Sequence, residues 1–154
     1  MRNTTLCYIE KENSYLMLYR NKKKNDENEG KYVGIGGHFL ENESPYDCVI
    51  REAYEETGLN IVPTYRGLIT FVSDKYECEQ MHLFTASSFE GELIECDEGA
   101  IAWVDKNKLD TIPMWEGDYI FFDLLKKRDD FFTVKLVYEG NTLISYSIDG
   151  VKIR

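Results

Sequence analysis

Three glutamates near the middle of the chain have the spacing of a metal site on a helix. Glu52, Glu55 and Glu56 fall within roughly a 100° arc when successive residues are placed about 100° apart around a helix axis. Like charges this close repel one another, and hard divalent cations such as Mg²⁺ prefer carboxylate oxygens and also bind phosphates. The spacing therefore predicts a metal site that could act on a phosphate. A solvated acidic helix face paired with Arg51 is the alternative that these residues alone leave open.

The local sequence predicts the helix that would carry these glutamates. Ser44 is a favourable N-cap residue, Pro45 suits the first helical position and Asp47 completes a capping box. Gly58 marks the end of the helix. Four apolar residues between these signals supply a packing face: Cys48, Val49, Ala53 and Tyr54. The glutamates are therefore expected on the remaining helix surface.

The segment from Gly37 to Leu59 resembles the sequence motif of the Nudix hydrolases. Glu43 follows Gly37 after five residues, and the pair Arg51-Glu52 follows after seven more. The invariant positions of that motif are all present. The resemblance implies an enzyme that uses Mg²⁺, or alternatively Mn²⁺, to cleave a nucleoside diphosphate linked to another group. It also implies a mixed β-sheet with a catalytic loop, helix and loop.

The resemblance further implies a role for each motif residue. Glu55 and Glu56 are expected to be the principal metal ligands, and Glu52 either a ligand or the base that orients water. The Gly37 carbonyl is expected to be another ligand, because glycine allows the backbone to approach closely. Outside the motif, Glu98 resembles the carboxylate that a later loop supplies to the metal. Asp97 is a substitute for Glu98, and a solvated loop acid is the alternative for either residue.

Three motif residues are expected to support this arrangement. Arg51 is expected to hold a glutamate by a charge-assisted hydrogen bond, and it is counted with the three glutamates as a catalytic residue. Glu43 is expected to support the loop, and Gly58 to end the helix.

The remainder of the chain resembles the MutT-like branch that hydrolyses oxidised purine nucleoside triphosphates such as 8-oxo-dGTP. In that branch a tryptophan packs on the purine and a following acid binds the base edge, and Trp115 and Asp118 occupy these positions. Lys23 resembles a lysine that contacts phosphate. The chain departs from the branch at Gly117, where some members carry an acid, and at Val33, where some carry an asparagine. A packed aromatic, a helix-capping acid and a solvated lysine are the respective alternatives.

Two rival functions remain open from the sequence. One is a Nudix hydrolase for ADP-ribose, a dinucleoside polyphosphate or a nucleotide sugar. The other is a non-catalytic nucleotide-binding module, in which the glutamates of the motif would usually be lost. All three glutamates are present, which favours an enzyme.

Strand and helix signals outside the motif predict an α+β domain, specifically an α/β/α sandwich in which a C-terminal helix packs on the sheet. The expected strands are 4–9, 14–19, 32–35, 64–72, 81–87, 100–104, 131–138 and 142–148. A short helical turn is expected over 105–109 and the C-terminal helix over 118–127.

The composition of the chain narrows the expected number of domains, the binding partners and the cellular location. The 154 residues, of which 43% are hydrophobic, favour one domain spanning 1–154. The formal charge of −10 disfavours binding to a nucleic-acid polymer. Neither a signal peptide nor a membrane span is evident, and four dispersed cysteines suit reduced thiols, so a soluble cytoplasmic protein is expected. The sequence leaves the oligomeric state open.

Overall fold

A mixed β-sheet forms the centre of the computed structural model, which describes residues 1–22 and 26–154. Within these residues the sheet has nine strands in the order β3-β2-β1-β5-β4-β7-β8-β9, and β6 also pairs with β2. The strands are β1 (Arg2–Lys11), β2 (Ser14–Tyr19), β3 (Tyr32–Val33), β4 (Leu59–Ser73), β5 (Glu79–Gly91), β6 (Ala100–Asp105), β7 (Phe132–Glu139), β8 (Thr142–Ile148) and β9 (Val151–Lys152). β1 runs parallel to β5, and β4 runs parallel to β7. The other pairings are antiparallel.

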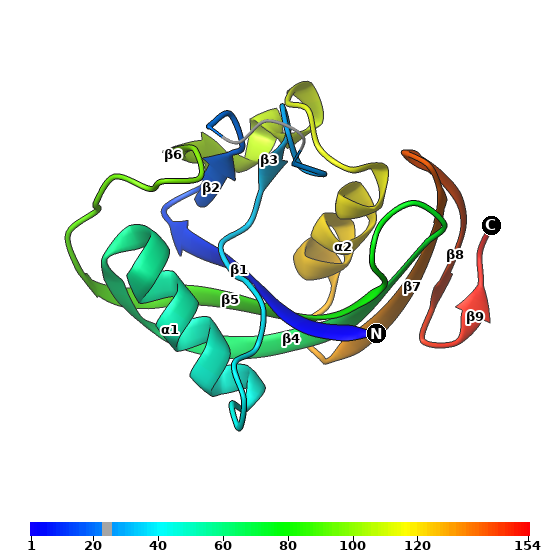
Figure 1. The fold of residues 1–154 in the computed structure, drawn as a ribbon, viewed down its shortest axis with the longest axis horizontal. Coiled ribbons are helices and arrows are strands. Elements are labelled where there is room, and N and C mark those ends of the chain that lie inside the picture. Colours follow the sequence, from blue (N-terminus) through cyan, green and yellow to red (C-terminus); the bar gives the residue numbers. More distant parts are fainter. Residues whose placement is uncertain (23–25) are drawn as a thin grey trace.

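The sheet separates two apolar cores. Successive side chains of a strand point to opposite faces, so Tyr8 of β1 enters one core while Cys7 and Ile9 enter the other. Helix α1 (Pro45–Thr57) packs in the core of Cys7 and Ile9, and helix α2 (Glu116–Lys127) packs in the core of Tyr8. Figure 1 shows the two helices on either side of β1 and β5. The predicted α/β/α arrangement is therefore confirmed.

Helix α1 begins and ends where its sequence signals predict. The Ser44 hydroxyl accepts from the backbone N–H of Asp47, and the Asp47 carboxylate accepts from the backbone N–H of Ser44. Gly58 ends the helix at a φ of 79°, a left-handed conformation that favours glycine. Cys48, Val49 and Ala53 are buried, whereas Tyr54 is exposed. The two caps thus fix the ends of the helix that carries the motif glutamates.

Several element boundaries differ from the predictions. β4 begins at Leu59 rather than 64, because the sheet accommodates Pro63 at a register shift between Val62 and Thr64. Helix α2 begins at Glu116 rather than 118, and Trp115 is its N-cap residue without a side-chain capping bond. A 3₁₀ helix at Lys106–Thr111 takes the place of the predicted helical turn. Among the described residues, no helix is long and apolar enough to cross a membrane.

Candidate active site

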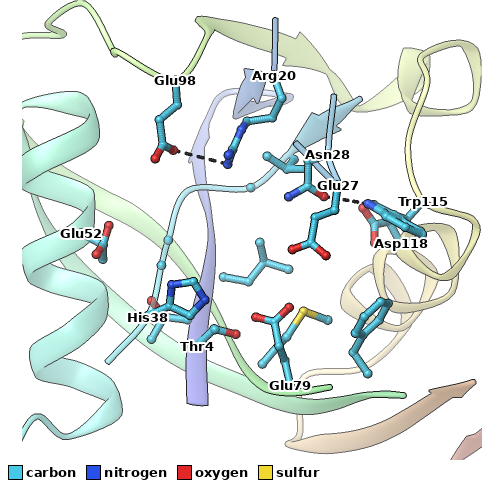
Figure 2. Close-up of a pocket in the computed structure, with 18 of the residues that line it drawn as sticks. Thr4, Arg20, Glu27, Asn28, His38, Glu52, Glu79, Glu98, Trp115 and Asp118 are labelled. Atoms are coloured by element: carbon cyan, nitrogen blue, oxygen red, sulfur yellow. Dashed lines mark hydrogen bonds and ion pairs between the residues drawn. The ribbon is translucent and has the colours of Figure 1, made fainter. Parts of the chain in front are cut away.

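A cavity of about 520 Å³ opens between the two helices and the N-terminal half of β1. Its lining includes Glu52 and Glu56 of α1 and the glycine loop at Gly37. Trp115 and Asp118, at the start of α2, line the same cavity. Figure 2 shows the carboxylate of Glu52 at one end and the side chains of Trp115 and Asp118 at the other. Segments that are far apart in sequence therefore form one continuous site.

The carboxylate end contains a buried acid that lacks a partner. The Glu56 side chain is only 9% exposed, and its Oε2 atom has no hydrogen-bond partner among the described residues. Burial, together with the charges of Glu98 and Glu52, raises the pKa of Glu56 from 4.5 to about 9. A buried carboxylate in this state is stabilised by a cation, because a positive charge offsets both burial and like-charge repulsion.

Glu55 lies apart from the other two glutamates of the motif. Its side chain is 58% exposed, it is absent from the cavity lining, and its Oε2 atom lies 3.1 Å from Nη1 of Arg51. Across residues 1–22 and 26–154, no three His, Cys, Asp or Glu side chains already form a group that could hold a metal ion. The structure therefore places Glu52 and Glu56 in the cavity lining, while Glu55 lies outside it and shares Nη1 of Arg51 with Glu52.

Arg51 connects the helix to the loop before it. Its guanidinium donates to both carboxylate oxygens of Glu43, at 2.7 and 2.9 Å, and to Oε1 of Glu52 at 2.8 Å. It also donates to the backbone carbonyl of His38 at 3.1 Å. Hydrogen bonding to Glu43, then to Glu52, raises the pKa of Arg51 above its ordinary value. A planar guanidinium suits this geometry because it donates in several fixed directions.

Glu43 holds the loop in place through two kinds of bond. Besides its bidentate contact with Arg51, its Oε1 atom accepts from the backbone N–H of Leu40 at 2.7 Å. The bonds to Arg51 lower the pKa of Glu43 below its ordinary value, which keeps the carboxylate ionised. These contacts are those expected of a residue that supports the loop.

The glycine loop brings backbone atoms against β1 and α1. A Cβ on Gly36 would lie 1.9 Å from the Thr5 carbonyl oxygen, and one on Gly37 would lie 2.6 Å from the carboxyl carbon of Glu52. The Gly37 carbonyl accepts from the backbone N–H of Thr5 at 2.9 Å and from the Cys48 thiol at 3.6 Å. Thr5 and Cys48, which sequence reasoning did not identify, thus orient the carbonyl that the motif resemblance assigns to the metal.

The residues at the carboxylate end fit a hard divalent cation. Glu56 offers a buried oxygen without a partner, and Glu52 and Glu98 are close enough to raise its pKa. Gly37 leaves open the space next to Glu52 that a side chain would fill. Carboxylate and carbonyl oxygens are the ligands that Mg²⁺ and Mn²⁺ prefer.

Glu98 reaches the cavity from the turn before β6. Its Oε2 atom lies 3.4 Å from Nη1 of Arg20 (Figure 2). Arg20 also contacts Asp26 at 2.8 Å. Lys22 anchors the same region by donating to the Cys96 carbonyl at 2.8 Å. Lys23, predicted to contact phosphate, lies outside the described residues. Arg20 is a cavity-lining cation that sequence reasoning missed, because a single arginine at a strand end carries no motif.

Trp115 and Asp118 form the opposite end of the cavity. Trp115 donates from Nε1 to Oδ1 of Asn28 at 2.7 Å, and the Lys31 ammonium lies 4.6 Å from the centre of a Trp115 ring. Phe71 and Tyr138 meet Trp115 edge to face. Trp115 is therefore packed, with 8% of its surface exposed, and also lines the cavity. The packing of Trp115 is therefore observed, and its contact with a purine stays a prediction.

The surroundings of Asp118 lead to a prediction about stability and pH. Asp118 is 8% exposed, and burial raises its pKa from 3.8 to about 8, although the charge of Lys31 opposes this. Because the folded-state pKa exceeds the unfolded one, the folded protein loses stability as pH rises from about 4 to about 8. At about 1.4 kcal/mol per pH unit between the two values, the loss is on the order of several kcal/mol. Asp118→Asn should remove this dependence.

The measurement is chemical denaturation of wild type and Asp118→Asn at pH 4.5, 6 and 8. The difference in the free energy of unfolding should grow in favour of Asp118→Asn as the pH increases. Asp123→Asn, an exposed substitution in the same helix, is the matched control and should follow wild type. Parallel curves for wild type and Asp118→Asn would contradict the prediction.

Glu27 and Glu79 line the cavity but, like Asp26, were not identified from sequence. Glu27 lies in the loop before β3, and Glu79 is the first residue of β5. The loop containing Glu27 is polar throughout, so its composition indicated a solvated surface segment. No local pattern marks either acid, because the tertiary fold alone brings them to one cavity.

Comparison with known proteins extends these observations. A family model described as the NUDIX domain matches residues 1–125. The Bacillus subtilis protein named "Uncharacterized Nudix hydrolase YvcI" is 30% identical over 161 residues, covering 100% of this chain and 98% of that protein. The oxidized purine nucleoside triphosphate hydrolase of Danio rerio is 29% identical over 132 residues, covering 84% and 85% respectively. The crystal structure of a mutator MutT protein from Bacillus halodurans has a TM-score of 0.86 and 26% identity, covering 97% and 98%.

Proposed function

The chain belongs to the Nudix hydrolase family, and on this premise we propose that it hydrolyses purine nucleoside triphosphates to the monophosphate and pyrophosphate. The proposed substrates include oxidised purines such as 8-oxo-dGTP. The observation that carries the proposal is the cavity that joins the carboxylates of α1 to Trp115 and Asp118. Its two ends suit the two ends of a nucleotide, since one can hold metal-bound phosphates and the other an aromatic base.

The proposed metal ligands are those of the motif together with Glu98. Glu52, Glu55 and Glu56 would hold Mg²⁺ or Mn²⁺ with the Gly37 carbonyl and Glu98. When bound, the ion would supply positive charge against the phosphates and would lower the pKa of a water molecule. Support comes from the buried Glu56 oxygen that lacks a partner, and from the chain's formal charge of −10, which would otherwise repel a triphosphate.

The chain's own side chains have distinct proposed roles in this reaction. Glu52 serves either as a metal ligand or as the base that accepts a proton from the attacking water. Arg51 holds the Glu52 carboxylate at 2.8 Å and therefore sets its orientation. The oxygen of water forms a bond to one phosphorus of the α–β anhydride as the anhydride bond breaks, which gives the monophosphate and pyrophosphate.

The proposed base site consists of Trp115 and Asp118. Trp115 offers an aromatic surface whose position is set by its bond to Asn28. Asp118 offers a carboxyl group that no hydrogen bond within the described residues engages, so it is available to the purine edge. The similarity to an oxidized purine nucleoside triphosphate hydrolase of Danio rerio supports this assignment.

A substrate panel tests the proposal and its dependence on metal. With Mg²⁺, dGTP, GTP and 8-oxo-dGTP should each yield the monophosphate and pyrophosphate, whereas dCTP should react much more slowly because it fills less of the base site. Removing the metal with EDTA should abolish turnover, and added Mg²⁺ or Mn²⁺ should restore it. Product analysis by ion-exchange chromatography distinguishes pyrophosphate from orthophosphate.

The same panel includes ADP-ribose, a dinucleoside polyphosphate and a nucleotide sugar. Faster turnover of one of these than of every purine triphosphate would overturn the proposed substrate but retain a Nudix hydrolase. Tight nucleotide binding without product in either metal would overturn the proposed activity.

A further inference from the structure

Glu27 and Glu79 face each other across the middle of the cavity. Glu27 comes from the loop before β3 and Glu79 from the start of β5, so they lie on opposite walls. Figure 2 shows both carboxylates between Glu52 at one end and the pair Trp115 and Asp118 at the other. If a nucleotide spans the two ends of the cavity, its nucleoside would therefore lie between Glu27 and Glu79.

The surroundings of Glu27 and Glu79 favour a bound ligand. Burial raises the pKa of Glu79, and the charge of Glu27 raises it further, whereas a bond from Thr4 lowers it. Burial likewise raises the pKa of Glu27, with a further contribution from Asp26. Two partly buried carboxylates that repel one another are stabilised by hydrogen-bond donors placed between them.

Independent observations toward the Trp115 and Asp118 end of the cavity also indicate a ligand rich in donors. Asp118 is more than nine-tenths buried and lines the cavity, and its carboxyl has no hydrogen-bond partner among the described residues. The Tyr8 hydroxyl, in a side chain that is fully buried and lines the same cavity, is also without a partner there. Buried polar groups are normally satisfied, so groups left open in a cavity wall point to a bound molecule.

We propose that Glu27 and Glu79 are specificity-determining residues that accept hydrogen bonds from N–H or O–H groups of the substrate's nucleoside. This inference rests on the proposed function, because it assumes that a nucleotide occupies the cavity. An ionised carboxylate accepts but cannot donate, so the two residues favour nucleosides with several donors. A guanine nucleoside also carries N1–H and a 3′-hydroxyl, but the donors assigned to Glu27 and Glu79 are the 2-amino group of guanine or the 2′-hydroxyl of ribose.

Substrates that differ by one donor distinguish these sources. ITP lacks only the 2-amino group of GTP, and dGTP lacks only its 2′-hydroxyl. Each substrate is measured with wild type, Glu27→Gln and Glu79→Gln in Mg²⁺, and kcat and KM are reported separately. Glu29→Gln and Glu77→Gln are matched controls, since both residues are near in sequence, exposed and outside the cavity lining.

At least one of Glu27→Gln and Glu79→Gln should raise KM for GTP by about tenfold with little change in kcat, because a charged acceptor becomes neutral. The increase should shrink for the substrate that lacks the recognised donor, as a double-mutant cycle between protein and ligand requires. The control variants should match wild type. Melting temperatures measured on all variants separate a loss of recognition from a loss of folding.

The outcomes separate the two proposals. If wild type hydrolyses none of the purine triphosphates, the proposed function fails. If wild type hydrolyses them but both cavity variants keep wild-type KM values for GTP, ITP and dGTP, only the role of Glu27 and Glu79 is overturned. An equal rise in KM for all three substrates would also overturn it, because no single donor would then be recognised.

Discussion

Glu56→Gln is expected to reduce Mg²⁺-dependent turnover on the order of a thousandfold while leaving the fold intact. Glutamine keeps the shape of the side chain but loses the charge that a metal ligand requires. The Glu56 carboxylate is buried and has an oxygen without a partner, so replacing it should not lower the melting temperature in metal-free buffer. Steady-state assays with dGTP and circular dichroism provide the two measurements.

Glu139→Gln, at an exposed position of β7, is the control and should retain wild-type turnover. Glu55→Gln is a second test, because Glu55 is exposed and absent from the cavity lining. A large loss of activity in Glu55→Gln would support its proposed role as a ligand. Turnover within a few-fold of wild type in Glu56→Gln would contradict the proposed metal site.

Arg51→Lys is expected to lower turnover by about a hundredfold although the positive charge is retained. Lysine cannot reproduce the bidentate contact with Glu43 while also donating to Glu52 and to the His38 carbonyl. Glu52 would then lose its fixed orientation and the loop its link to the helix. The melting temperature should fall by roughly a few degrees, because several charge-assisted bonds are lost together.

Arg128→Lys is the matched control for this change. Arg128 also bridges carboxylates, binding both oxygens of Asp130 and one of Asp149, but it is absent from the cavity lining. Both variants should lose stability, and only Arg51→Lys should lose turnover. If the two variants retain equal activity, the orientation of Glu52 by Arg51 is not needed for catalysis.

The helix of the motif could be predicted in detail because its signals are local. The capping box of Ser44 and Asp47 and the left-handed Gly58 involve residues within one helical turn of each end. Strand boundaries were less predictable. Pro63 normally argues against a strand interior, but a register shift next to it lets β4 continue from Leu59.

The position of Glu55 shows the limit of helical spacing as an argument. Spacing places the three glutamates on one arc of the helix, but the direction of each side chain depends on its partners. Nη1 of Arg51 contacts both Oε1 of Glu52, which lines the cavity, and Oε2 of Glu55, which is largely exposed and absent from the lining. Convergence of all three on one metal therefore remains a prediction for the Glu55 and Glu56 variants to test.

By itself, the sequence determined the motif from Gly37 to Leu59, the helix that carries it and the α/β/α architecture, because short-range spacing, capping and strand alternation specify these features. Only the tertiary structure decided which distant residues face the glutamates. Asn28, Glu27, Glu79 and Arg20 reach the cavity through strand pairing and loop packing. The physical reason is that contacts between residues far apart in sequence depend on how the sheet is assembled, which no local pattern of side chains records.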